Sequence, residues 1–231
     1  MKLVSGLKNL LVPAASKPRR ILTGPFKGLC MNLSLQHQAQ LYLGLFERET
    51  YPWLERLSKG ISSAIDVGAA RGEYTVYFLR KTGATKVFAF EPDLTCMPAL
   101  HENLGLNGLG PSERLELSTK FLGASVNQNE ISLDALAPSI RSPCFVKLDV
   151  DGGEEQVLNG ARNFNNLPGI RWLIETHSPQ LEVACDKILQ AAGFQTRIIP
   201  NARWRIFVPE LRPIAHNRWL AAWKSNDLAL T

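Results

Sequence analysis

Residues 61–93, ISSAIDVGAARGEYTVYFLRKTGATKVFAFEPD, decide the fold of this chain. Apolar residues are bunched over 61–67, which predicts a strand, and are spaced at helical intervals over 73–81. A second bunched run over 86–90 predicts another strand. The stretch therefore predicts a β-α-β unit whose first strand and helix are joined by a turn at residues 68–72.

The turn has features that suit a nucleoside ligand. Gly68 and Gly72 enclose it, so the backbone is able to pass close to a ligand. The helix that follows presents free N–H groups and a partial positive charge toward the turn. Ala70 stands where the dinucleotide fingerprint requires its second glycine, which favours a nucleoside without phosphates over a pyrophosphate. The alternative is a structural turn that uses glycines for its own geometry.

Two acids accompany the turn. Asp66 precedes it, and Glu91 ends the second strand, 19 residues after Gly72. An acid at that strand tip suits hydrogen bonds to the two hydroxyls of a ribose. The pattern D-V-G-x-x-x-G with a distal Glu resembles motif I and the acidic loop of class I S-adenosylmethionine-dependent methyltransferases. This resemblance implies that Asp66, Gly68, Ala70 and Gly72 surround the cofactor and that Glu91 holds its ribose.

Length and composition are those of a single soluble domain. A chain of 231 residues with 45% hydrophobic and 20% charged residues can bury a core unaided. Its apolar runs are far shorter than the roughly 18 residues of a membrane span. The four cysteines lie far apart without a C-x-x-C pair, which argues against a zinc site or a disulfide framework. Free thiols favour a cytoplasmic location.

Basic residues are concentrated at the front of the chain. Residues 1–46 carry six Lys or Arg and no acid, whereas the remainder has a net charge of −1. Such a front can contact a membrane surface, an anionic substrate or nucleic acid, or can be a solvated, partly disordered arm. We expect an arm at 1–20 and one domain at 21–231, made of a preface at 21–60 and a Rossmann-like core at 61–224. Nucleic acid is not an expected partner, and the oligomeric state is left open.

The rest of the chain alternates strands and helices. This pattern predicts an α/β fold with a doubly wound, mostly parallel sheet and an antiparallel last strand. In the preface we expect a hairpin at 21–33 and a helical region at 38–57 broken by Pro52. The later elements are predicted as helices at 93–104, 154–164 and 178–192, and as strands at 115–122, 144–150, 170–175, 194–199 and 218–223, with a short strand or turn at 131–136.

A predicted buried strand that is followed by acids contains a second group of candidate site residues. In residues 146–161, VKLDVDGGEEQVLNGA, Lys147 and Asp149 lie on one face of the strand and must be paired, because burying either charge alone is costly. One interpretation is an internal ion pair that tightens the sheet. The other places Asp149 at the acceptor, where it orients or deprotonates a hydroxyl while Lys147 tunes its charge.

Two residues at the end of the next strand are further candidates. His177 is able to act as a base near neutral pH, or it caps the following helix or pairs with Glu175. Asp149 and Glu175 end neighbouring strands and can approach a divalent cation together. Two carboxylates are too few ligands to predict a metal site. The candidate catalytic residues are therefore Asp149, His177, Lys147 and Glu175.

The segment K-L-D-V-D-G-G-E-E-x-V-L-x-G-A is similar to a signature of FkbM-type methyltransferases, with Asp151 in place of a glutamate. Other pieces of that pattern follow in order: L-G-L-F-E-R-E at 43–49, the turn motif at 66–75, A-F-E-P at 89–92, S-L-D-A-L at 132–136 and I-E-T-H at 174–177. The resemblance adds Thr75 to the cofactor site. It implies methylation of a hydroxyl on a sugar, a glycan or a natural product.

The sequence is also compatible with three other functions. The basic arm is compatible with an RNA methyltransferase, and the β-α-β unit with a nucleotide-dependent oxidoreductase. A protein that binds the cofactor without turnover is the third. Near the C-terminus, arginines alternate with aromatic residues, which indicates either core-facing strands or a base-stacking surface. These residues are Arg197, Arg203, Trp204, Arg205, Phe207, Arg212, Arg218, Trp219 and Trp223.

Overall fold

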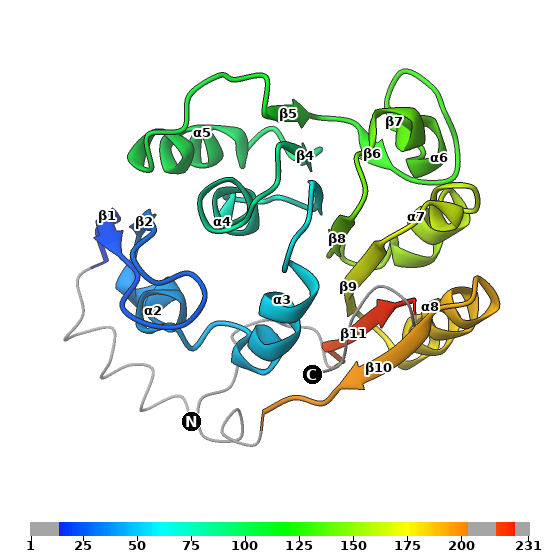
Figure 1. Cartoon of the computed structure of the whole chain (residues 1–231). Coiled ribbons are helices and arrows are strands. Elements are labelled where there is room, and N and C mark those ends of the chain that lie inside the picture. Colours follow the sequence, from blue (N-terminus) through cyan, green and yellow to red (C-terminus); the bar gives the residue numbers. More distant parts are fainter. Residues whose placement is uncertain (1–13, 203–215, 225–231) are drawn as a thin grey trace.

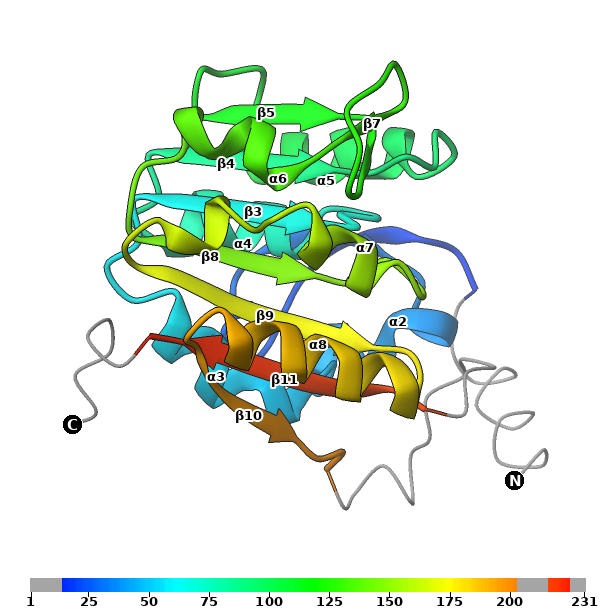
Figure 2. The same cartoon turned by 90° about the vertical axis from the view of Figure 1, so that its right-hand side faces the viewer.

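A seven-stranded sheet forms the centre of the molecule in a computed structural model that describes residues 14–202 and 216–224. The strand order is β10-β11-β9-β8-β3-β4-β5. In Figure 2 the arrowheads of β3, β8 and β9 point one way and that of β11 points the opposite way. The predicted fold class is therefore confirmed. The strands are β3 (Ser63–Val67), β4 (Lys86–Phe90), β5 (Leu115–Ser118), β8 (Cys144–Leu148), β9 (Ile170–Thr176), β10 (Gln195–Ile199) and β11 (Arg218–Trp223).

Helices cover both faces of the sheet (Figure 1). Because successive strand residues point to opposite faces, each strand contributes to two cores. Ala64, for example, packs in the core on one face, and its neighbour Ile65 packs in the core on the other face. The helices on the face of Ala64 are α2 (Leu35–Leu43), α3 (Tyr51–Leu57), α4 (Glu73–Lys81) and α5 (Met97–Leu106). Those on the face of Ile65 are α6 (Leu133–Leu136), α7 (Glu154–Asn159) and α8 (Pro179–Ala191).

The preface differs from its prediction in two places. Its hairpin pairs β1 (Lys17–Arg20) with β2 (Cys30–Leu33), so the hairpin begins inside the segment expected to be an arm. The helical region breaks at Gly44 and Glu47, which both have positive φ angles, and not at Pro52. Pro52 lies in the first turn of α3, where proline is well tolerated because that N–H has no helical partner. Residues 1–13 of the arm lie outside the described residues.

Side-chain caps explain where several helices begin. The Ser178 hydroxyl accepts a hydrogen bond from the Leu181 N–H at 3.1 Å, which confirms the predicted start of α8. By contrast, α5 begins later than predicted, because Asp93 first forms a turn by accepting the Thr95 N–H at 2.8 Å. Residues 131–136, expected as a strand or turn, are mostly the short helix α6, which Ser132 caps.

The end of the sheet supports the core interpretation of the C-terminal aromatic residues. Trp219 and Trp223 on β11 are 0% and 7% exposed, and Trp223 stacks on Trp53 of α3. Arg218 forms an ion pair with Glu182 of α8. The arginines and aromatic residues at 203, 204, 205, 207 and 212 lie outside the described residues.

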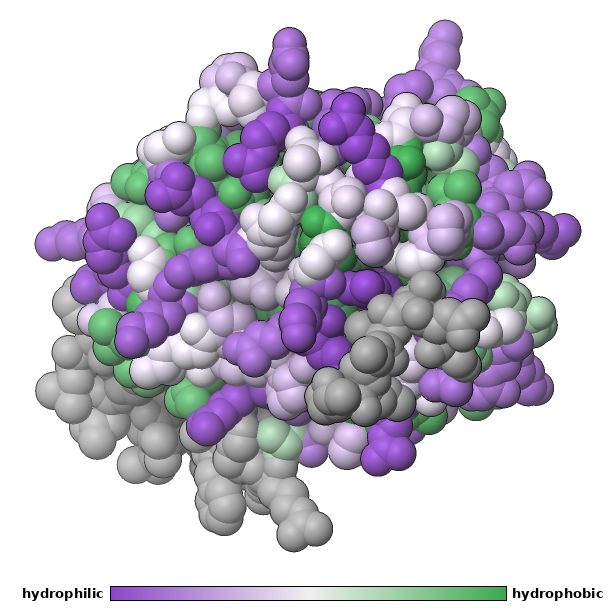
Figure 3. All heavy atoms as spheres, in the orientation of Figure 1, coloured by the Kyte–Doolittle hydropathy of each residue, from purple (hydrophilic) through white to green (hydrophobic). Residues whose placement is uncertain are grey.

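Short elements complete the fold. The strand predicted at 115–122 is split, because β5 ends at Ser118 and β6 (Phe121–Leu122) pairs instead with β7 (Glu130–Ile131). The 3₁₀ turns are η1 (Arg48–Thr50), η2 (Ala137–Ser139) and η3 (Phe164–Asn166). Among the residues described, helices fall short of the length and apolar character that crossing a membrane requires. On the face in Figure 3, hydrophobic side chains are scattered among hydrophilic ones.

Candidate active site

Three charged side chains meet at the carboxyl ends of the central strands. Asp66 on β3 lies directly beside Lys147 on β8, and Glu175 ends β9. Alternation along each strand places all three on the face covered by α4 and the preface, the face to which Ala64 also points. Each is at most 3% exposed. The sheet therefore carries a buried row of charges at the edge where doubly wound folds bind ligands.

Lys147 is the cation at the centre of this row. Its ammonium donates to the Gly68 carbonyl at 2.8 Å and lies 3.4 Å from Asp149 Oδ2 and 3.6 Å from Asp66 Oδ1. Burial alone would depress the pKa of Lys147, but the carboxylates of Asp149 and Asp66 raise that pKa above its ordinary value. Lys147 is therefore charged at neutral pH. The predicted ion pair with Asp149 is present, and it extends to Asp66.

Asp66 and Thr75 support the turn from within the core. Both are fully buried, and the Thr75 hydroxyl donates to Asp66 Oδ2 at 2.6 Å. Burial raises the pKa of Asp66, while Lys147 and the Thr75 hydrogen bond lower it in part. These two predicted cofactor residues thus join β3, β8 and α4 beneath the turn.

The protein itself provides a reason for the glycines of the turn. Gly68, Ala70 and Gly72 all have positive φ angles. A Cβ added to Gly68 would lie 1.8 Å from the Asp149 carbonyl oxygen, and one on Gly72 would approach the Leu100 side chain at 3.3 Å. Backbone conformation and packing within the protein therefore favour glycine at these positions, and the close approach of a ligand stays a prediction.

Glu91 lies against the turn at the tip of β4. It is 6% exposed, and its Oε2 accepts the Ala70 N–H at 2.7 Å while Oε1 accepts the Asp93 N–H at 2.8 Å. A carboxylate has about four acceptor positions, so each oxygen keeps capacity for one more donor. Glu91 thus lies directly against the turn, and its role in holding a ribose stays a prediction.

His177 lies among several carboxylates beyond the end of β9. Its Nδ1 is 2.8 Å from Glu154 Oε1, and its Nε2 is 3.2 Å from Asp151 Oδ1 and 3.5 Å from Asp149 Oδ1. Glu175 Oε2 is more distant at 3.9 Å. The histidine does not cap α8, because the side chain of Ser178 does so.

The surroundings of His177 affect its use as a base. Burial would lower the pKa of His177, but the hydrogen bond from Nδ1 to Glu154 and the charges of Asp149 and Asp151 raise that pKa above its ordinary value. These neighbours therefore favour the protonated imidazole and disfavour its use as a base.

Two buried residues of the site, Glu47 and Glu154, were not predicted from the sequence. Glu47, in the preface, is 2% exposed and accepts the Tyr74 hydroxyl hydrogen bond at 2.6 Å. The Lys147 ammonium lies 5.3 Å from the centre of the Tyr74 ring. Glu47 belongs to the motif at 43–49, but no periodicity marked it as buried. Glu154 is also fully buried. Its place in the first turn of a helix predicts a favourable interaction of its charge with the helix dipole, but it does not predict burial.

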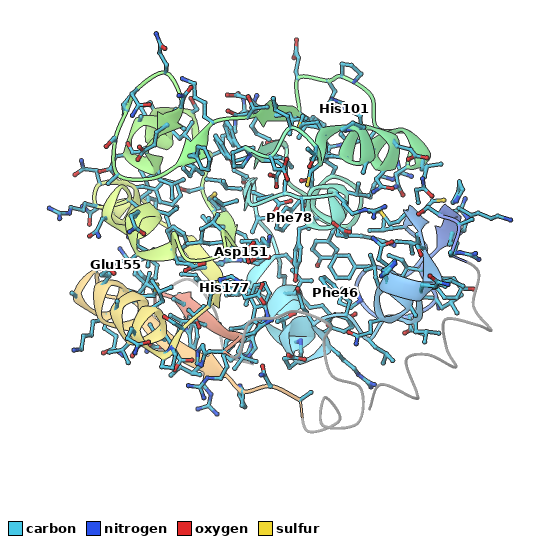
Figure 4. All side chains as sticks on the ribbon, turned by 180° about the vertical axis from the view of Figure 1, so that it is seen from behind. Phe46, Phe78, His101, Asp151, Glu155 and His177 are labelled. Carbon is cyan, nitrogen blue, oxygen red and sulfur yellow. The ribbon has the colours of Figure 1, made fainter. Side chains whose placement is uncertain are left out.

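Acids surround Lys147 and His177. Among the described residues, six acids lie close to these two groups. Figure 4, which views the molecule from behind, shows His177 and Asp151 beside each other. Carboxylates at a site favour a ligand that brings positive charge. The six acids are Glu47, Asp66, Asp149, Asp151, Glu154 and Glu175.

Comparisons with known proteins support the fold. A scan against protein-family models and a search of curated proteins find no match. Among solved structures, methyltransferase FkbM from Methylobacillus flagellatus KT superposes with a TM-score of 0.55 at 18% identity, covering 71% of this chain and 44% of that chain. An O-methyltransferase from Bacillus cereus in complex with SAH superposes with a TM-score of 0.52 at 12% identity, covering 76% of this chain and 79% of that chain.

A SAM-dependent O-methyltransferase from Thermotoga maritima gives a TM-score of 0.50 at 18% identity, covering 77% of this chain and 64% of that chain. The chain thus spans less than half of the FkbM structure. The fold is the Rossmann-like fold of class I S-adenosylmethionine-dependent methyltransferases. One fold hosts many activities, so the residues of the site determine the function.

Proposed function

We propose that this chain is an S-adenosylmethionine-dependent O-methyltransferase of the FkbM type. The cofactor lies over the turn of residues 68–72, and the methyl group goes to a hydroxyl of a sugar, glycan or natural-product acceptor. The observation that carries the proposal is the Glu91 carboxylate, which is bound to the Ala70 N–H beside the point where the strand order reverses between β3 and β8. Ligands of doubly wound sheets bind at that point.

The charge of the site favours a sulfonium nucleoside over a dinucleotide. The carboxylates that the structure describes around Lys147 attract a positively charged sulfonium and repel a pyrophosphate. Ala70 replaces the glycine that a pyrophosphate needs, and its N–H is already bound to Glu91. In addition, β11 runs antiparallel between β9 and β10, whereas dinucleotide-binding sheets of this type are mostly parallel.

Methyl transfer to an oxygen requires alignment and the removal of one proton. Asp149 is suited to contact the acceptor, because its side chain is 17% exposed whereas those of Asp66 and Glu175 are fully buried. The Lys147 ammonium lies 3.4 Å from Asp149 Oδ2 and holds this carboxylate in place. Asp149 therefore orients the acceptor hydroxyl, and Lys147 positions Asp149.

Calorimetric titration with S-adenosylhomocysteine (SAH) tests the cofactor site. We expect the wild type to bind SAH and Glu91→Gln to bind it about 10- to 150-fold more weakly, because hydrogen bonds to a charged group contribute about 1.5–3 kcal/mol. The 2′-deoxyribose analogue of SAH should lose affinity for the wild type but lose little more for Glu91→Gln. Failure of the folded wild type to bind SAH, or equal affinities of the two proteins, would contradict the proposal.

A second measurement separates the rival functions. Release of SAH in the presence of hydroxylated acceptors distinguishes an enzyme from a protein that only binds the cofactor. Thermal-shift comparison of NAD(H) with SAH distinguishes a methyltransferase from an oxidoreductase. We expect stabilisation by SAH alone, because a ligand that binds only the folded state raises the melting temperature.

A further inference from the structure

We infer that Asp149, Asp151 and His177 form a binding site for a divalent transition-metal ion. The first two residues follow β8, and the third follows β9. One ligand atom from each lies within 4.8 Å of the others. The sequence suggested Asp149 and Glu175 as candidate ligands, but Glu175 is fully buried. Asp151 and His177 take the place of Glu175 in this site.

The spacing of the three groups fits a single ion. His177 Nε2 lies 3.2 Å from Asp151 Oδ1 and 3.5 Å from Asp149 Oδ1. Two ligands that each lie about 2.1 Å from one ion are roughly 3.0–3.5 Å apart in octahedral or tetrahedral geometry. Both pairs therefore have the separation that shared coordination requires.

His177 presents a free nitrogen to the two carboxylates. Its side chain is only 5% exposed, and Nε2 makes no hydrogen bond within the part of the chain that the structure describes. Nδ1 is bound to Glu154 Oε1 at 2.8 Å, and a carboxylate can only accept, so Nδ1 carries the hydrogen. Metal-binding histidines are oriented in this way by a carboxylate on the other ring nitrogen. An ion would take the place of the Nε2 proton.

Glu154 is itself held in place, which fixes the ring of His177. Its Oε1 also accepts the Gly152 N–H at 3.0 Å, and its side chain is fully buried. Glu154 therefore acts as a positioning residue behind the histidine. The carboxylates of Asp149 and Asp151 also offset the charge of a divalent ion.

The ligand set indicates which ions fit. Mg²⁺ and Ca²⁺ prefer oxygen ligands, whereas an imidazole with two carboxylates suits Mn²⁺, Fe²⁺, Co²⁺ or Zn²⁺. Such an ion would lower the pKa of an acceptor hydroxyl bound to it. This use of the ion rests on the proposed function, but binding of the ion does not.

Electron paramagnetic resonance of Mn²⁺ titrated into the full chain tests the site without an activity assay. We expect the signal of free Mn²⁺ to fall with one equivalent bound. Asp151→Asn and His177→Gln should each weaken binding at least about tenfold. Glu155→Gln is the matched control, since Glu155 lies one residue from Glu154 on α7 but outside the three ligands, as Figure 4 shows. That variant should bind Mn²⁺ as the wild type does.

Asp151→Asn keeps the test valid if His177→Gln fails to fold, because the Asp151 side chain is 77% exposed. Unchanged circular dichroism would show that this variant is folded. An undiminished signal at millimolar Mn²⁺, or an equal loss of binding in Asp151→Asn and Glu155→Gln, would overturn the inference. SAH titration without metal separates the two proposals: SAH binding without Mn²⁺ binding refutes only the metal site, and the reverse refutes only the cofactor site.

Discussion

Replacing Lys147 by methionine should destabilise the protein strongly. The substitution keeps the length of the side chain but removes the ammonium that contacts Asp66, Asp149 and the Gly68 carbonyl. Lys147 is 3% exposed and Asp66 is fully buried, so water cannot replace the lost contacts. Removing one partner of a buried ion pair costs about 3–5 kcal/mol. For a chain of this size, that corresponds to a fall in melting temperature of roughly 6–20 °C.

A surface lysine provides the matched control. The Lys86 ammonium lies 3.2 Å from Glu116 Oε2, but the two side chains are 27% and 54% exposed. Exposed ion pairs contribute about 0–1 kcal/mol, so Lys86→Met should leave the free energy of unfolding almost unchanged. The same substitution therefore has a large effect at position 147 and a small one at position 86.

A double-mutant cycle isolates the pair of Lys147 with Asp66. Asp66→Asn removes the charge and keeps an oxygen that accepts from Thr75. In the double variant the buried carboxylate is absent, so its destabilisation should be smaller than the sum of the single effects by at least about 1 kcal/mol. Urea unfolding followed by tryptophan fluorescence measures all four free energies. A cost below about 1 kcal/mol for Lys147→Met, or additive effects, would refute this account of the cluster.

Three further predictions concern the turn, the thiols and the buried acid. Gly68→Ala should cost about 2–4 kcal/mol in urea unfolding, whereas Gly193→Ala, also at positive φ but with open space around it, should cost about 1 kcal/mol. Burial raises the pKa of Cys185 to about 12 and that of Cys144 further. A thiol reagent should therefore modify these two only after unfolding, and the other two in the native protein. Because burial raises the pKa of Asp66, its contribution to stability is full below about pH 3.9 and is lost as the pH rises through the folded-state pKa. The wild type should therefore lose stability relative to Asp66→Asn as the pH rises above that value. A difference that stays constant as the pH rises would contradict the raised pKa.

The elements with strong periodicity were predictable from the sequence. The strands at 86–90 and 218–223 and the helix at 73–81 have the bounds expected of them. Their apolar residues recur at intervals that only one secondary structure can bury on one side. Parallel strands bring their carboxyl ends to one edge, which is why Asp66 and Asp149 could be predicted to lie close together.

Residues whose environment depends on packing between distant segments were not predictable. Glu47 is buried because the preface folds over α4 and meets Tyr74. Gly68 is a glycine because the Asp149 carbonyl packs against it, and no local pattern contains that contact. The break at Gly44 was missed because proline gave the more evident signal, although Pro52 suits the first turn of a helix.

Asp149 links the two proposals, because its carboxylate lies between the two proposed sites. It is 3.4 Å from the Lys147 ammonium and 3.5 Å from His177 Nε2. A sulfonium above the glycine turn and a metal ion between Asp151 and His177 would both be attracted by this carboxylate. Two cations that share a carboxylate also repel each other. Each ligand should therefore bind more weakly when the other is present, and by the same factor for both ligands.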